Sequence, residues 1–161
     1  MEKTDLCMEE KFVDTKALRA RAEQYCARAE RCASEVEALL KKHGATVRQA
    51  DEVIGHLQEH GFMNEARYCR AFVHDKVAFD GWGKRKIQYA LRAKHLPDNV
   101  IAAAMDDIDE AAYKANITAL WKRHAADVPD KQLRFMLQRG YSYEDIRRYT
   151  KLEAEEDELC E

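Results

Sequence analysis

Residues 61–73 read Gly-Phe-Met-Asn-Glu-Ala-Arg-Tyr-Cys-Arg-Ala-Phe-Val, and residues 81–96 read Gly-Trp-Gly-Lys-Arg-Lys-Ile-Gln-Tyr-Ala-Leu-Arg-Ala-Lys-His-Leu. Gly61 is a helix stop, and Asn64 is a good N-cap for a helix whose apolar residues recur at helical spacing. Gly81 and Gly83 bracket a turn, after which cations surround the apolar positions of a second amphipathic helix. This stretch predicts two helices joined by a tight turn, and the second helix is basic.

The helical pattern extends over almost the whole chain. Leu18, Ala22 and Tyr25 fall on one helix face, and no long segment alternates apolar and polar residues as a half-buried strand would. Ser34-x-x-Glu37 and Thr46-x-x-Gln49 match the capping-box pattern of helix starts. We therefore predict an all-α chain of about nine helices, at residues 15–30, 34–43, 47–60, 64–79, 84–94, 97–107, 110–126, 129–139 and 143–155.

The predicted helices fall into three similar triplets. Ala45, Leu96 and Tyr141 each follow a helix stop, at spacings of 51 and 45 residues, and five residues earlier stand Leu40, Leu91 and Met136. Such a degenerate repeat is typical of helical modules that are too small to bury their apolar faces alone and that stack into an array. We predict three tandem three-helix repeats in an elongated, curved protein. The ranges are an N-terminal tail at 1–14, repeats at 15–62, 63–108 and 109–152, and an acidic C-terminal tail at 153–161.

The quoted stretch resembles the central block of the RecX family, whose members regulate the RecA recombinase. The family pattern is met by Gly61, Phe62, Met63, Asn64, Glu65, Tyr68, Cys69, Phe72 and Val73, and then by Gly83, Lys86, Ile87, Leu91, Lys94 and Leu96. His95 stands where the family has a glycine, which puts the local turn in doubt. A third family element, a helix that ends in Arg-Gly-aromatic, is matched by residues 135–141, Phe-Met-Leu-Gln-Arg-Gly-Tyr.

Charge is unevenly distributed along the 161 residues, although the net charge is only −3. Residues 16–48 carry eight Lys or Arg against four Asp or Glu, residues 64–95 carry eight against three, and residues 96–161 carry nine against fifteen. Two basic segments therefore precede an acidic third, which indicates an anionic partner for one face, although a run of charges on a helix is often only a solvated face. The candidate partner-binding residues are Arg67, Arg70, Lys84, Arg85, Lys86, Arg92 and Lys94, with Arg19, Arg21 and Arg28 in the first basic segment.

The aromatic residues near these cations have two interpretations. Trp82, between two glycines, is expected to be a packing lid, because a large aromatic side chain is usually well buried. Basic residues interleaved with aromatics also bind phosphates or acidic protein surfaces, and the role of Tyr89 stays open.

The resemblance implies binding to RecA–single-stranded DNA filaments, in the groove between protomers. There the protein would block filament growth or promote disassembly, and so lower ATP hydrolysis, strand exchange and RecA-assisted LexA cleavage, as a regulator in DNA repair and the SOS response. Direct contact with single-stranded DNA stays open as well. The alternatives are a helical nucleic-acid-binding protein that acts without a recombinase, and a helical adaptor for another protein. We expect a monomer that is not an enzyme.

Other chemistry has little support in the sequence. His56-Leu-Gln-Glu-His60 matches an inverted zinc-peptidase spacing, but Gly61 ends the helix at once and no third ligand follows in a recognisable motif, so no metal is expected. No nucleophile elbow or phosphate-binding Gly-rich loop is present, and no cofactor is expected. The five cysteines, an odd number without a Cys-x-x-Cys pair, argue against a disulfide framework. The start of the chain does not resemble a secretory leader and no apolar run could span a bilayer, which predicts a soluble, cytoplasmic protein.

Overall fold

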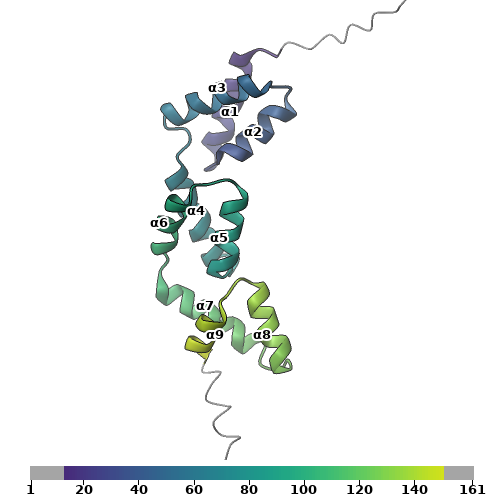
Figure 1. The fold of residues 1–161 in the computed structure, drawn as a ribbon, viewed down its shortest axis with the longest axis vertical. Helices are drawn as coiled ribbons and strands as arrows, with labels where there is room; N and C mark the ends of the chain where they lie inside the picture. The colour runs from purple at the N-terminus through teal and green to yellow at the C-terminus, as the bar shows by residue number, and fades with distance from the viewer. Residues whose placement is uncertain (1–12, 151–161) are drawn as a thin grey trace, which may run out of the picture. The chain divides into compact units, whose positions relative to one another are not determined.

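The computed structural model describes residues 13–150, and within this range it contains nine helices and no strand (Figure 1). The helices are α1 Thr15–Arg28, α2 Ala33–Lys42, α3 Val47–Glu59, α4 Glu65–Ala78, α5 Lys84–Ala93, α6 Asp98–Asp106, α7 Glu110–Arg123, α8 Pro129–Gln138 and α9 Tyr143–Thr150. The all-α prediction with nine helices is confirmed, and each predicted boundary up to the start of α9 lies within three residues of the observed one. The predicted acidic tail, the end of the ninth predicted helix and most of the N-terminal tail lie outside the described residues.

Local capping explains where several helices begin. Thr46 Oγ1 accepts a hydrogen bond from the Gln49 backbone N–H at 3.2 Å, and Gln49 Oε1 accepts one from the Thr46 backbone N–H at 3.0 Å, as the pattern predicts. The capping box predicted at Ser34 and Glu37 is wrong, because the N-cap of α2 lies two residues before Ser34. This N-cap is Cys32, whose backbone N–H donates to Glu35 Oε2 at 3.2 Å.

The chain divides into two compact units after Asn64. The first unit contains α1, α2 and α3, which pack on one another around a shared apolar core. The buried core residues are Leu18, Ala22, Val36, Leu40, Ala50, Val53, Leu57 and Met63. Each helix contributes apolar residues one turn apart, so the core follows directly from the helical pattern of the sequence.

The second unit contains α4 to α9, and the lengths of the first two helices of each triplet repeat those of the first unit. Helices α1, α4 and α7 each have 14 residues, and α2, α5 and α8 each have 10. The residues that close the second helix of each triplet, Gly44, His95 and Gly140, all have positive φ, at 83°, 62° and 94°. The same backbone turn thus recurs at equivalent positions, and His95 adopts the left-handed conformation that a glycine would adopt more easily. The domain boundaries of the three repeats stay a prediction.

Within the second unit, the turn before α5 meets the turn after α8 (Figure 1). The Gly83 backbone N–H donates to the Arg139 carbonyl oxygen at 2.8 Å, and the Arg85 N–H donates to the Gly140 carbonyl oxygen at 3.0 Å. The hydroxyl of the buried Tyr141 donates to the Gly81 carbonyl oxygen at 2.8 Å. These bonds satisfy backbone groups at the start of α5 with groups at the end of α8, and so fix the basic helix against the last triplet.

Candidate functional site

Lys84, at the start of α5, is held by α7. Its ammonium Nζ donates to Glu110 Oε2 at 2.9 Å and lies 4.5 Å from the centre of the Tyr113 ring. The Tyr149 hydroxyl donates to the other oxygen of Glu110 at 2.6 Å. The hydrogen bonds from Tyr149 and Lys84, in that order, lower the pKa of the Glu110 carboxyl, whereas burial raises it slightly. Lys84 therefore links helices within the second unit and offers only part of its charge to a partner.

Lys86 lies against Trp82. Its Nζ lies 4.2 Å from the centre of the Trp82 ring, and Lys76 Nζ lies 4.5 Å from the same centre. Phe72 packs edge-on against Trp82, with ring centres 6.5 Å apart. Trp82 is half-buried, so the interpretation of this residue as a packing lid fits its contacts, and the two ammonium groups gain cation–π attraction from the ring.

The outward face of α5 carries Arg85, Tyr89 and Arg92, at positions i, i+4 and i+7, all of them exposed. Tyr89 is 77% exposed, an unusually open position for an aromatic residue in the middle of a helix. Arg92 Nε lies 3.1 Å from Asp98 Oδ1. Among the described residues, the Arg85 side chain has no ion-pair partner. Arg85 is therefore the cation of α5 whose charge is most available to a partner.

The remaining predicted site residues lie elsewhere. Lys94 caps the C-terminus of α5. Arg67 and Arg70 are exposed on α4, and Arg70 Nε lies 3.6 Å from Asp107 Oδ2, at the rim of a hollow of about 400 Å³ between α4, α6 and α7. No residue of α5 lines that hollow, so Arg70 belongs to a different part of the surface from Arg85.

Three candidates, Arg19, Arg21 and Arg28, are on α1 in the first unit. The guanidinium of Arg19 is within 3.7 Å of Glu52 Oε1 on α3, and the side chains of Arg21 and Arg28 are exposed. Arg21 and Arg28 are seven residues apart and so share one face of α1, whereas Arg19 lies on the opposite side of the helix, against Glu52 of α3.

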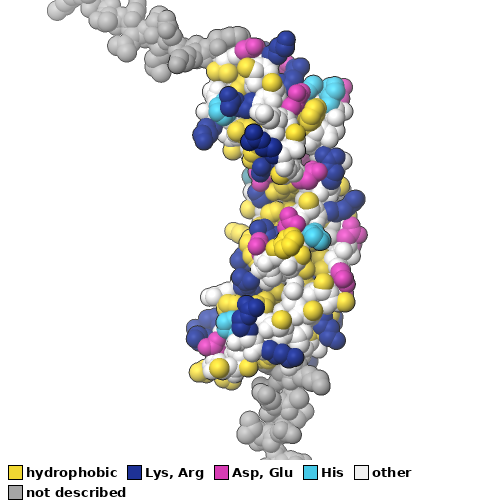
Figure 2. Space-filling view, turned by 180° about the vertical axis from the view of Figure 1, so that it is seen from behind, with side chains coloured by type: hydrophobic (Ala, Val, Ile, Leu, Met, Phe, Trp, Pro, Cys, Tyr) yellow, Lys and Arg dark blue, Asp and Glu magenta, His cyan; other side chains and the backbone are white. Residues whose placement is uncertain are grey.

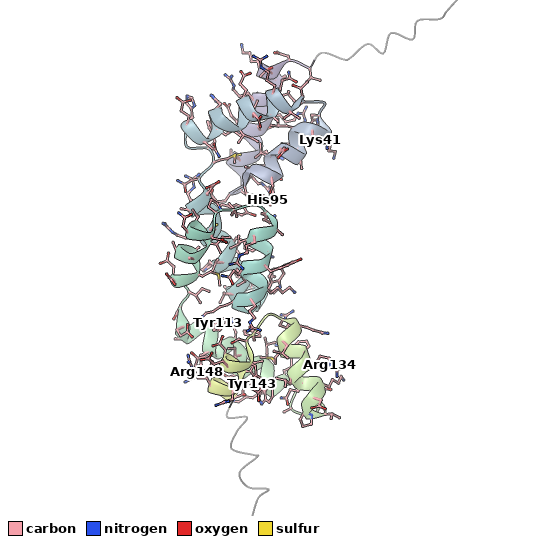
Figure 3. All side chains as sticks on the ribbon, viewed as in Figure 1. Lys41, His95, Tyr113, Arg134, Tyr143 and Arg148 are labelled. Carbon is pink, nitrogen blue, oxygen red and sulfur yellow. The ribbon has the colours of Figure 1, made fainter. Side chains whose placement is uncertain are left out.

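The sequence prediction left out part of α8. Arg134 and Leu137 occupy the positions in α8 that Tyr89 and Arg92 occupy in α5, and both are exposed. Figure 3 shows Arg134 pointing outward from α8. The repeat could have predicted these residues, because adding its spacing of 45 to the positions in α5 gives the equivalent positions in α8.

The structure shows what the histidines at the end of α3 do. His56 Nε2 lies 2.8 Å from Glu23 Oε1 on α1, and His60 Nδ1 lies 2.9 Å from the His56 carbonyl oxygen. The pair thus joins α1 to α3 and closes a helix end. Among residues 13–150, no group of three or more His, Cys, Asp or Glu is placed to hold a metal ion. In the same part of the chain, no helix is long and apolar enough to cross a membrane.

Comparison with known proteins gives the family. The model described as the second three-helix domain of RecX matches residues 64–105. A regulatory protein RecX from Ectopseudomonas mendocina is 32% identical over 145 residues, which cover 82% of this chain and 91% of that protein. The chain belongs to the RecX family. Another RecX protein, from Leptothrix cholodnii, is 28% identical over 142 residues, with 84% and 88% of the two chains covered.

Solved RecX structures share the fold of this chain. The crystal structure of RecX from Lactobacillus salivarius matches with a TM-score of 0.73 at 20% identity, over 85% of this chain and 94% of that one. A second structure, of a regulatory protein RecX, matches with a TM-score of 0.74 at 14% identity, over 85% and 73%. The resemblance to RecX found in the motifs is therefore confirmed, and the second of those motifs is the α5 turn that docks against α8.

Proposed function

We propose that this chain binds RecA–single-stranded DNA filaments and lowers filament growth, ATP hydrolysis, strand exchange and co-protease activity. The main support for this proposal is membership in the RecX family. The exposed Arg85 on α5 is the candidate contact residue. The chain acts by binding, as a monomer, and needs no catalytic group of its own.

A binding protein changes filament growth only if it favours one filament state over another. An exposed cation on a helix that is fixed by neighbouring helices suits this role, because little side-chain and backbone order has to be gained on binding. Arg85 meets the description: its backbone N–H is bonded to Gly140, and its side chain is exposed and without an ion pair among the described residues.

Action on nucleic acid alone has weaker support. A protein that follows phosphates needs several free cations. Here Lys84 is bonded to Glu110 and Arg92 is paired with Asp98, and Figure 2 shows Lys and Arg side chains interleaved with Asp and Glu on the face in view. These pairings favour a protein surface as the main contact.

RecA's ATPase activity on single-stranded DNA, measured with and without this protein, tests the proposal. We expect the ATPase rate to fall as the protein is added, because filament growth is blocked or reversed. An unchanged rate at saturating protein concentration contradicts the proposal. A salt titration of binding to single-stranded DNA alone measures any direct contact with phosphate, which gives a steep log–log slope.

A further inference from the structure

The second helices of the last two triplets, α5 and α8, present exposed residues in the same register. The exposed residues of α5 include Arg85, Tyr89 and Arg92, and the equivalent positions in α8 are Asp130, Arg134 and Leu137. Arg134 has no ion-pair partner among the described residues, and Leu137 is 42% exposed. Both α5 and α8 thus carry exposed cations beside an exposed Tyr or Leu side chain.

The start of α5 and the end of α8 meet at one junction. The Arg85 backbone N–H is bonded to the Gly140 carbonyl oxygen at 3.0 Å, and Leu137 lies only three residues before Gly140. A helix rises about 1.5 Å per residue, so the outer face of α5 begins near the point where the outer face of α8 ends. Both helices lie on the same side of the second unit in Figure 1.

We propose that Arg85, Tyr89, Arg92, Arg134 and Leu137 form one interaction surface, here named the α5–α8 strip, and that it binds an acidic protein surface with an apolar recess. The inference rests on the proposed function and specifies which surface meets the partner. It adds Tyr89, Arg134 and Leu137 to the contact. It leaves out Lys84, whose ammonium group is bonded to Glu110, and Lys86, whose ammonium group lies over the Trp82 ring.

The composition of the strip indicates a protein partner. Tyrosine and arginine are enriched at the centres of protein interfaces, where a few anchors carry most of the binding energy, whereas lysine is depleted there. Tyr89 is flanked on its own face by Arg85 and Arg92, so a partner that buries the ring also meets two guanidinium groups. Arg92 Nε lies 3.1 Å from Asp98 Oδ1, so the strip is not the run of unpaired cations that binding along a nucleic-acid backbone favours.

The test measures the affinity of the full-length chain for RecA–single-stranded DNA filaments and, separately, for the same single-stranded DNA without RecA. Tyr89→Ala is compared with Phe79→Ala, because the two side chains are 77% and 79% exposed and both belong to the second unit. Arg134→Glu is compared with Arg123→Glu, which makes the same charge change at an exposed arginine on α7. All four positions are exposed, so the variants should keep the wild-type melting temperature.

We expect Tyr89→Ala and Arg134→Glu each to weaken filament binding roughly tenfold or more, as truncation or reversal of an interface anchor does. Phe79→Ala and Arg123→Glu should change binding less than about twofold, as surface positions outside an interface do. If all four variants bind the filament as tightly as wild type, the α5–α8 strip is not the contact surface, while the proposed function stands. If Tyr89→Ala and Arg134→Glu lose as much affinity for the DNA without RecA as for the filament, and DNA binding depends steeply on salt, the strip is a nucleic-acid surface. That result also overturns the inference. If wild type itself does not bind the filament, the proposed function fails and the strip fails with it.

Discussion

Gly83 and Gly140 touch through their backbones. A Cβ placed on Gly83 would lie 2.1 Å from the Gly140 carbonyl carbon, and a Cβ placed on Gly140 would lie 2.3 Å from Lys86 Cβ. Neither position can hold a side chain without moving a backbone or a Cβ atom. Two of the sequence elements that resemble RecX, one beginning at Gly83 and the other ending in Arg139-Gly140-Tyr141, therefore meet in space, and these glycines serve the docking of α8 on α5.

Gly83→Ala tests this contact. Gly83 has a φ of −78°, which any residue adopts, so alanine adds no backbone strain and most of the effect should come from the steric clash. We expect a loss of about 2–3 kcal/mol in the free energy of unfolding, the range of a strongly overpacked site. Tryptophan fluorescence during urea unfolding measures it, since Trp82 and Trp121 are both in the second unit.

Gly55→Ala is the matched control for that substitution. Gly55 lies inside α3, and a Cβ there meets no atom within 4 Å. Alanine is favoured over glycine in a helix interior by about 0.8–1 kcal/mol, so this variant should be more stable by far-UV circular dichroism. Destabilisation by both variants to the same extent would falsify the steric explanation.

His95→Gly should stabilise the chain. His95 is exposed and has a φ of 62°, in the left-handed region that costs a non-glycine residue about 1–2 kcal/mol. Part of this gain is lost to the greater freedom of glycine in the unfolded chain, so we expect about 0.5–1 kcal/mol in a urea titration. Ala93→Gly, in the last turn of α5, is the control and should destabilise by about the same amount. A lower melting temperature for His95→Gly would show that the imidazole makes a contact worth more than the strain.

Glu110→Gln should lower stability at neutral pH but not in acid. The hydrogen bonds from Tyr149 and Lys84 hold the folded-state pKa of Glu110 below its ordinary value of 4.5. A depressed folded-state pKa stabilises the fold above that ordinary value, and the contribution is lost as the pH falls through the folded-state pKa. The effect is small, because the carboxylate is largely exposed. Melting temperatures of wild type and Glu110→Gln should therefore differ at pH 7, and the difference should shrink as the pH falls below 4.5. A difference of the same size at neutral pH and in strong acid contradicts the assignment.

Arg85→Glu should weaken inhibition of RecA's ATPase while leaving the melting temperature unchanged. The exposed side chain contributes little to folding, whereas reversal at an interface replaces attraction by repulsion.

Lys86→Glu is expected to behave differently. It removes an ammonium group 4.2 Å from the Trp82 ring, and the lost cation–π contact is worth about 0.5–1 kcal/mol at such a site. A double substitution of Arg85 and Lys86 would combine a loss of inhibition with a loss of stability. Each single variant is therefore measured alone, for inhibition of the RecA ATPase and for melting temperature. Full inhibition of the RecA ATPase by Arg85→Glu, at the concentration at which wild type inhibits, would place the functional surface elsewhere. The next candidates would be Arg19, Arg21 and Arg28 on α1.

The sequence by itself determined the helices, the helix-stop residues and the repeat. Apolar spacing, caps and left-handed glycines act over a few residues, so Thr46 and Gln49 could be paired, and Gly44 could be identified as a helix stop, from neighbouring residues alone. The motifs around Gly61 and Gly83 were also enough to recognise the RecX family. The error at Ser34 arose because Cys32, a poor N-cap by type, begins α2 with help from Glu35.

The tertiary structure alone established which cations are free and why the glycines are needed. Lys84 bonds to a carboxylate 26 residues away, and Gly83 docks on a carbonyl 56 residues away, in each case across helices whose pairing no local pattern specifies. Arg85 and Lys86 are adjacent cations in the sequence, yet one is exposed and the other lies against Trp82 and Gly140. Their environments differ because successive helical residues point about 100° apart, and only the packing of α8 against α5 determines which direction faces solvent.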